Sequence, residues 1–189
     1  MPPKVKITKQ DIIDTALALI REGGESALNA RGIAAALNCS TQPIFSNFAT
    51  MDELQEAVTA AAYTHYLSFL QSEAESGKYP QYKAMGMAYI RFAKEEKELF
   101  RLLFMCDRAG KDLVPTADFW TSVEIIMQAN GVSREKAELM HLEMWTCVHG
   151  IAAMLATSFF APEWELISQM LTDVYQGIRA RHTSKEGVQ

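Results

Sequence analysis

Two short helical patterns separated by a tight turn constrain the fold of this chain more than any other feature. In the first, NARGIAAAL at residues 29–37, the apolar side chains of Ile33 and Leu37 recur at helical spacing. Asn29 precedes them and has a side-chain oxygen that can accept a hydrogen bond from a free backbone N–H group at the helix start. Asn38 then predicts a turn, because asparagine tolerates the left-handed backbone conformation.

The second pattern predicts a helix from Thr41 to about Phe48, with Ser40 as its N-cap. Pro43 falls in the first turn, where its missing N–H costs nothing, and Ile44 and Phe48 would form the buried side. The outward face carries short polar side chains and one aromatic ring, which are Thr41, Gln42, Phe45, Ser46 and Asn47. Such groups suit contacts with base edges and phosphates in the major groove of DNA.

The run from Ile12 to Leu54 resembles the N-terminal domain of the TetR family of transcriptional regulators. In that family a glycine turn ends the first helix, an Ile-Ala pair follows the cap of the second, and a short recognition helix precedes a Ser-Lys-Glu-x-Leu motif. The matching positions here are Gly23–Gly24, Asn29, Ile33–Ala34, Asn38–Cys39–Ser40, Phe45–Ser46–Asn47–Phe48 and Thr50–Met51–Asp52–Glu53–Leu54. The order and spacing are more specific than those of a generic helix-turn-helix.

Three positions depart from the family pattern. Phe45 stands where tyrosine is usual, Met51 replaces the usual lysine, and Asn38 stands where glycine is common. The first two changes remove a hydroxyl and a cation that would bind phosphate, so we expect weaker affinity for the DNA backbone with the geometry retained. The residues expected to contact double-stranded DNA are Asn29, Arg31, Ser40, Thr41, Gln42, Pro43, Phe45, Ser46 and Asn47.

Length and composition are those of an ordinary globular protein. The chain has 189 residues, of which 49% are hydrophobic and 22% charged, enough to bury a core. Its cysteines, Cys39, Cys106 and Cys147, are odd in number and far apart, so no disulfide framework is expected. The weakly polar run Gly150–Pro162 is too short to span a bilayer. We expect a cytoplasmic protein without a signal peptide or a membrane partner.

Charge is unevenly distributed along the chain. The net charge is −5, yet the first 50 residues hold a slight excess of basic side chains. Lys4, Lys6 and Lys9 could lie along phosphates as an N-terminal arm. A solubilising tail is an equally good interpretation of these lysines.

Helical patterns continue through the rest of the chain, and no stretch alternates convincingly with period two. The predicted fold is all-α with about nine helices: an N-terminal three-helix DNA-binding domain at residues 1–50 and a C-terminal ligand-binding and dimerisation domain at residues 51–189. The first helix is expected from the cap Thr8 to Gly23, and later helices at 51–76, 82–93, 95–104, 117–130, 133–160 and 163–181, with a loop at 108–115. The buried stripe of the long helix after Thr50 is predicted to be Leu54, Val58, Ala61, His65 and Phe69.

The penultimate predicted helix is apolar on more than one side. One side carries Met140, Met144, Val148, Ile151, Leu155 and Phe159, and the other carries Trp145, Ala152, Ala153 and Ala156. A helix of this kind must be covered on most sides, and the small residues Cys147, Gly150, Ala153 and Ala156 would let another helix approach closely. We therefore expect a homodimer with a four-helix interface that includes the last helix. Some TetR family members carry Trp, His and Gly here, matching Trp145, His149 and Gly150.

The resemblance also implies a pocket for a small, largely apolar effector in the C-terminal domain. Candidate lining residues are Tyr66, Tyr89, Phe100, Phe104, Trp120, Met144, Trp145 and His149. For any single residue in this set, core packing is the better interpretation, since methionine and aromatic side chains fill cores as well as pockets.

Catalysis, metal binding and a cofactor have little support in the sequence. His141 and His149 lie on one predicted helix, but no His-Glu-x-x-His, Cys-x-x-Cys or glycine-rich phosphate motif is present. A structural histidine is the simpler interpretation, and Cys39 near a helix start is better explained as a small buried residue than as a redox sensor.

The sequence thus predicts a ligand-responsive transcriptional regulator, a repressor rather than an enzyme, that binds an inverted repeat as a homodimer and is released by its effector. The main alternative is a helical ligand-binding or oligomerisation protein whose DNA-reading head is degenerate, as Phe45 and Met51 suggest. An enzyme is the third alternative.

Overall fold

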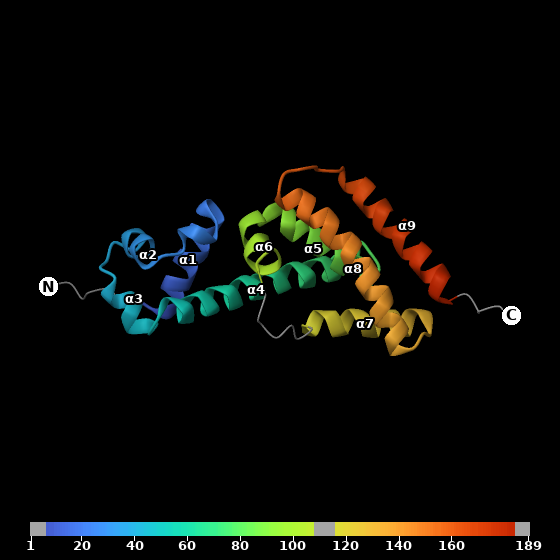
Figure 1. The fold of residues 1–189 in the computed structure, drawn as a ribbon, viewed down its shortest axis with the longest axis horizontal. Helices are drawn as coiled ribbons and strands as arrows, with labels where there is room; N and C mark the ends of the chain where they lie inside the picture. Colours follow the sequence, from blue (N-terminus) through green and yellow to red (C-terminus); the bar gives the residue numbers. More distant parts are fainter. Residues whose placement is uncertain (1–6, 108–115, 184–189) are drawn as a thin grey trace. The chain divides into compact units, whose positions relative to one another are not determined.

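A computed structural model describes residues 7–107 and 116–183, and within these ranges the chain is all-α, as predicted (Figure 1). A short 3-10 helix, η1 (Glu25–Ala27), accompanies the α-helices. The α-helices are α1 (Lys9–Gly23), α2 (Ala30–Ala36), α3 (Gln42–Asn47), α4 (Met51–Glu75), α5 (Gln81–Glu95), α6 (Lys97–Phe104), α7 (Ala117–Asn130), α8 (Arg134–Ala156) and α9 (Trp164–Thr183). The predicted loop at 108–115 and the arm residues Lys4 and Lys6 lie outside the described residues.

The helices form two compact units. The first consists of residues 1–68 together with Glu96–Cys106, and the second consists of Phe69–Glu95 together with residues 107–189. Helix α4 contributes to both units, because the division falls within it. The predicted boundary at residue 50 separates a DNA-binding part from a ligand-binding and dimerisation part, and this division of function remains a prediction.

In the first unit, α1 packs against α2, α3 and α6. Its start is a capping box: the Asp11 backbone N–H donates to Thr8 Oγ1 at 3.1 Å, and the Thr8 backbone N–H donates to Asp11 Oδ2 at 2.8 Å. The helical spacing of five apolar residues predicts the buried side of α1, which would be Ile12, Ile13, Ala16, Leu19 and Ile20. Ile12, Ala16 and Ile20 are buried as predicted, whereas Ile13 and Leu19 are half-buried. The helix ends at Gly23, and the next residue, Gly24, has a positive φ of 72° that favours glycine.

The predicted stripe of α4 was wrong in its second half. Leu54 and Val58 are buried as expected, but the next buried side chains are Ala62 and Tyr66 rather than Ala61 and His65, and Phe69 is half-buried. The buried positions follow a strict four-residue step, whereas the prediction stepped by three after Val58. His65 is instead half-buried beside a carboxylate.

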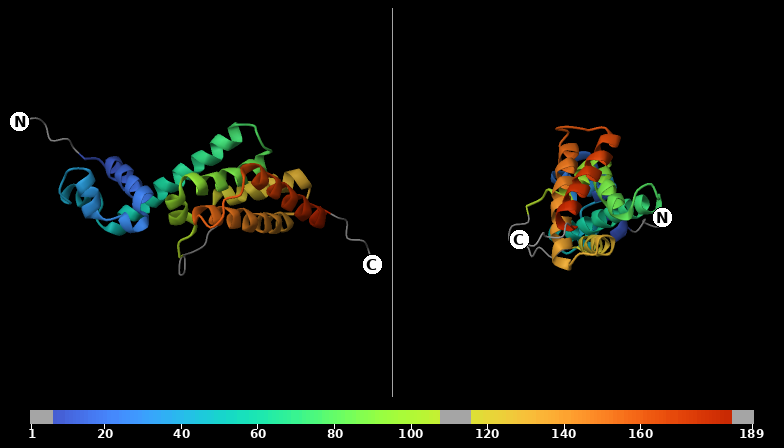
Figure 2. Two further views of the ribbon diagram at one scale, coloured as in Figure 1. Left: turned by 90° about the horizontal axis from the view of Figure 1, so that it is seen from above. Right: turned by 90° about the vertical axis from the view of Figure 1, so that its right-hand side faces the viewer.

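In the second unit, α8 is the central helix and packs against α5, α7 and α9. Figures 1 and 2 show α9 running alongside α8. The predicted inward side of α8 is confirmed for five side chains, which are Met140, Met144, Val148, Ile151 and Leu155. One helix in the described ranges, α8 itself, is long and apolar enough to cross a membrane, and 44% of its most apolar stretch is buried within the protein.

The predicted end of α8 was wrong by about four residues. The helix ends at Ala156, and Ser158 adopts a left-handed conformation with φ 56°. Phe159, predicted to continue the inward side, is 82% exposed because it follows that turn. On the opposite side Trp145 is exposed, whereas Ala152 and Ala156 are fully buried in the core of the chain itself.

Candidate DNA-reading surface and effector site

Helix α2 starts as predicted. The Asn29 side-chain oxygen accepts a hydrogen bond from the Gly32 backbone N–H at 2.8 Å, and the Asn29 amide donates to the Ala27 carbonyl at 3.1 Å. At the other end, Asn38 adopts a positive φ of 51°, which confirms the predicted turn. This turn sets the direction in which the chain enters α3.

Helix α3 begins one residue later than predicted, and Ser40 is not its cap. Thr41 occupies the N-cap position without a capping hydrogen bond from its side chain. Pro43 lies in the first turn, and its fixed φ favours the helix there. Ile44 is fully buried and Phe48 is 2% exposed, so the predicted inner side of α3 is confirmed.

The outward face of α3 is partly as predicted. Gln42, Phe45 and Ser46 are exposed, and Phe45 presents 48% of its surface. Thr41, Pro43 and Asn47 are half-buried, while Asn29, Arg31 and Ser40 are exposed on the adjacent segment.

Two of the polar side chains on α3 already bind backbone carbonyls. The Asn47 amide donates to Pro43 at 2.8 Å and to Ile7 at 3.4 Å, and the Ser46 hydroxyl donates to Gln42 at 2.9 Å. Among the polar residues of α3, Gln42 therefore has the least committed hydrogen-bonding side chain.

Lys9 is the one arm lysine within the described residues. Its ammonium group lies 3.5 Å from Glu53 Oε1 and 4.9 Å from the centre of the Phe48 ring. Lys9 thus belongs to helix α1 and contacts the protein around the start of α4. Its cationic charge remains close to α3 and could still attract phosphate.

Thr50 and Glu53, three residues apart, predict a capping box at the start of α4, and the structure differs from it in one bond. The Glu53 backbone N–H donates to Thr50 Oγ1 at 3.1 Å, as in a capping box. The Glu53 carboxylate accepts from the backbone N–H of Ala49 at 2.6 Å instead of that of Thr50. Both bonds tie the start of α4 to the segment that follows α3.

A carboxylate that the sequence did not single out links three parts of the first unit. Glu96 accepts from Arg21 Nε at 2.8 Å and Arg21 Nη2 at 3.1 Å, and its Oε1 lies 2.7 Å from His65 Nε2. Burial alone would raise the pKa of Glu96, but the hydrogen bonds and charges of Arg21 and His65 outweigh it and lower that pKa. Glu96 thereby joins α1 and α4 at the start of α6.

The eight predicted effector residues fall into separate groups. Three lie in the first unit, where the Tyr66 and Phe104 rings are 5.1 Å apart and the Phe100 and Phe104 rings 5.3 Å apart. Phe100 is fully buried and Tyr66 is 3% exposed. These side chains contribute to the core around α6, and whether they also line a pocket stays a prediction.

A second group joins α5 to α8 in the second unit. The Tyr89 hydroxyl lies 2.9 Å from His149 Nδ1, and the Trp145 ring stacks on the His149 ring with centroids 5.0 Å apart and an angle of 19°. Burial lowers the pKa of His149, so its neutral form is favoured. Met144 is buried on the same helix, one residue before Trp145.

Trp120 belongs to a third group, an apolar cluster in the second unit. It packs with Phe119 around the buried side chains of α7 and α8. His141, next to this cluster, is buried with its Nδ1 2.9 Å from the Tyr82 hydroxyl, and burial lowers its pKa to about 4. Burial and the contact with Tyr82 suit a structural histidine, which stays a prediction. Within the described ranges, no group of three or more His, Cys, Asp or Glu side chains could hold a metal ion.

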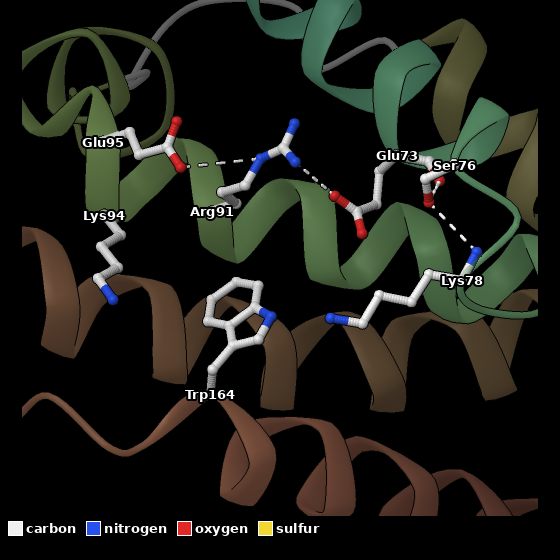
Figure 3. Close-up of a pocket in the computed structure, with 7 residues that line it drawn as sticks. All are labelled: Glu73, Ser76, Lys78, Arg91, Lys94, Glu95 and Trp164. Atoms are coloured by element: carbon white, nitrogen blue, oxygen red, sulfur yellow. Dashed lines mark hydrogen bonds and ion pairs between the residues drawn. The ribbon is translucent and has the colours of Figure 1, made fainter.

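A hollow in the second unit is lined by none of the eight predicted residues (Figure 3). It is formed by charged side chains of α4 and α5, the connection between them, and Trp164 at the start of α9. Its volume is about 330 Å³. The sequence alone does not point to this hollow, because most of its lining residues are charged and each is typical of an exposed surface.

The capped helix α2, the tight turn at Asn38 and the short helix α3 with its exposed polar face together form a helix-turn-helix. Residues 82–174 match a family described as "Tetracyclin repressor-like, C-terminal domain". None of the curated proteins matches the sequence. Residues 82–174 therefore carry the C-terminal domain of the TetR family of transcriptional regulators, which confirms the family that the sequence predicted.

Several solved structures share the fold. A protein with unknown function from Rhodococcus sp. RHA1 is 19% identical with a TM-score of 0.72, and the alignment covers 93% of this chain and 97% of that one. A TetR-like transcriptional regulator from the same organism is 14% identical with a TM-score of 0.64, over 98% and 100%. A TetR variant from Acinetobacter baumannii AYE in complex with minocycline is 17% identical with a TM-score of 0.61, over 95% and 100%.

Proposed function

We propose that this TetR family regulator is a repressor that binds an inverted-repeat operator as a homodimer and is released by a small, largely apolar effector. The observation that carries the proposal is the exposed face of α3, with Gln42, Phe45 and Ser46 presented outward while Ile44 and Phe48 are buried beneath. A rigidly anchored short helix with an open polar face suits insertion into the major groove.

Dimerisation is supported by apolar side chains that the single chain leaves uncovered. Leu139, Leu142 and Trp145 on α8 are 46%, 52% and 42% exposed, and Leu166 on α9 is 50% exposed. Gly150 lies on α8 with no atom within 4 Å of the position a Cβ would take. Nothing within the chain therefore requires glycine there, whereas a second helix approaching closely would. Helices α8 and α9 of two subunits would form the four-helix interface.

For the effector, the group around His149 offers the best combination of chemistry. Trp145 and Met144 supply polarisable apolar surface, and the Tyr89–His149 pair supplies one hydrogen-bonding point that would orient a ligand. The DNA-binding part would comprise residues 1–50 and the effector-binding and dimerisation part residues 51–189.

Coupling between effector and operator would run through α4 and Glu96. Helix α4 has 25 residues and contributes to both units, and Glu96 directly follows α5 while holding Arg21 and His65. An effector that binds the second unit more tightly in one arrangement of α4 and α5 would shift the population away from the DNA-binding form.

Selection of bound fragments from random duplex DNA tests this function. The regulator predicts enrichment of one inverted repeat, with half-site centres about 34–36 Å or a multiple apart, and binding that weakens steeply with salt. Equal, weak binding to all sequences would favour the alternative, a ligand-binding protein with a degenerate reading head. That alternative draws on Phe45 and Met51, which lack the hydroxyl and the cation usual in the family.

A further inference from the structure

The hollow at the end of α4 has a distribution of charge that suggests a ligand of its own. Side chains from α4, α5, the connection between them and α9 line an open hollow of about 330 Å³, near the lower end of the range for small-molecule pockets. Trp164, half-buried, forms its one aromatic wall, and three basic and two acidic side chains surround it (Figure 3).

One acidic and one basic side chain neutralise each other inside the hollow. Glu73 is 6% exposed, and Arg91 Nη1 donates to its carboxylate at 2.6 Å. The Arg91 guanidinium also lies 5.1 Å from the centre of the Phe69 ring. Because this pair is short and largely buried, the Glu73 charge is compensated and repels an anion in the hollow only weakly.

The remaining acidic group, Glu95, compensates little of the positive charge. Its carboxylate is 3.9 Å from Arg91 Nε, too far for a hydrogen bond, and its side chain is 55% exposed to solvent. Arg91 Nε itself is buried and has no hydrogen-bond partner in the described part of the chain.

The two lysines of the hollow carry the excess positive charge. Neither Lys78 nor Lys94 forms an ion pair with a carboxylate in the described ranges. The Lys94 ammonium lies 5.8 Å from the centre of the Trp164 ring, and the Lys78 ammonium 5.2 Å from that of Tyr79. Figure 3 shows the two ammonium groups on opposite sides of the Trp164 indole. Such an arrangement leaves a flat apolar surface between two uncompensated cations.

We propose that this hollow binds a small aromatic dicarboxylate. The ring of the ligand would stack on the Trp164 indole, and its two carboxylates would meet Lys78 and Lys94. Offset stacking and paired charge favour a flat dianion over a neutral ring, which gains only the stacking, and over inorganic phosphate, which gains only the charge. The site is separate from the Tyr89–His149 pair and requires no DNA, so it goes beyond the proposed function.

The test uses terephthalate, benzoate, benzamide and inorganic phosphate as probes of the full chain at neutral pH. Binding is followed by calorimetry and by the indole N–H signals of the three tryptophans in NMR spectra. The signal of Trp164, assigned with a Trp164→Phe variant, should shift with terephthalate, while those of Trp120 and Trp145 stay in place. Terephthalate should bind at least about fivefold more tightly than benzoate, and benzamide and phosphate more weakly than either.

Charge-neutralising variants separate a specific site from general attraction of anions. Lys78→Gln and Lys94→Gln should each weaken terephthalate binding about fivefold or more, and Lys136→Gln, an exposed lysine at the start of α8, should leave it unchanged. Both hollow lysines are at the surface of the fold, so these variants should fold normally. Equal loss in all three variants, equal binding of benzamide, or no shift of the Trp164 signal up to about 10 mM terephthalate would overturn the proposal.

Discussion

Replacing Glu96 by glutamine should loosen the first unit at three helices at once. The carboxylate accepts two hydrogen bonds from Arg21 and contacts His65 at 2.7 Å. Glutamine has nearly the same shape, but it has no charge and only one acceptor oxygen. The variant therefore removes the charge-assisted part of the interaction while leaving the packing of α1, α4 and α6 almost unchanged.

The size of the effect follows from burial. Hydrogen bonds to charged groups contribute about 1.5–3 kcal/mol, and exposed ion pairs about 0–1 kcal/mol. The Glu96 side chain is 16% exposed and the Arg21 side chain 40% exposed, between these two limits. We therefore expect Glu96→Gln to lower the free energy of unfolding of the first unit by about 1–2 kcal/mol, a factor of about 5–30 in the equilibrium constant.

Hydrogen exchange followed by mass spectrometry is the suitable assay. All three tryptophans lie in the second unit, so intrinsic fluorescence would not report on the first. Peptides from α1 and α6 should exchange about 5–30 times faster in Glu96→Gln. The matched control is Glu95→Gln at the neighbouring position, whose carboxylate is 55% exposed and 3.9 Å from Arg91. Its effect on α1 and α6 should be negligible.

The pH dependence gives an independent check. Because the folded-state pKa of Glu96 is lowered from its ordinary value of 4.5, the unfolded chain binds a proton more readily. The contribution of Glu96 is present above pH 4.5 and declines as the pH falls through the folded pKa. The difference between wild type and Glu96→Gln should therefore be present at neutral pH and shrink as the pH falls below about 4.5. Wild-type exchange of α1 in Glu96→Gln at pH 7 would show that the Glu96 carboxylate does not stabilise this helix.

Three further predictions concern the reading head, the interface and the core. Phe45→Tyr should raise DNA affinity about fivefold in anisotropy titrations, because it adds a hydroxyl that can bind phosphate. Met51→Lys should steepen the dependence of log affinity on log salt concentration by about one unit of slope per subunit. No change in either variant would show that residues 45 and 51 do not face the phosphates. Gly150→Leu should shift the dimer strongly towards monomer in light scattering, and Gly150→Ala should do so to a smaller extent; an unchanged dimer in Gly150→Leu would contradict a close helix contact there. Burial lowers the pKa of His141 from its ordinary value of 6.5 to about 4, so the free energy of unfolding should fall as the pH drops from 6.5 to 4. His141→Gln should make this fall less steep in denaturant titrations. An equally steep fall in the variant would count against a buried neutral histidine.

Local signals in the sequence predicted the reading head well. Pro43 fixes the backbone at the start of α3, and Ile44 and Phe48 lie four residues apart, so short-range rules placed the helix to within a residue at each end. The cap was wrong because Ser40 and Thr41 are equally good candidates by residue type. No rule of local sequence distinguishes two neighbouring hydroxyl residues when neither makes the capping bond.

Longer-range features could not be predicted in the same way. Glu96 meets residues 31 and 75 positions away, so only the folded chain reveals its network. The end of α8 was missed because Phe159 and Phe160 continue its apolar composition, while the left-handed turn at Ser158 ends the helix. The effector candidates share aromatic or polarisable side chains, but residue type does not determine where a residue lies in the fold. They are therefore divided between the two units.

Whether α3 reads DNA can be measured by titrating the selected duplex with wild type and with Gln42→Ala in fluorescence anisotropy experiments. Gln42 is exposed at the start of α3, and Gln128→Ala, on exposed α7 surface, is the matched control. Loss of one base-reading side chain should weaken specific binding by about 1–3 kcal/mol, roughly five- to 150-fold, with non-specific binding unchanged. Equal affinity of Gln42→Ala and Gln128→Ala for the selected duplex would contradict the account.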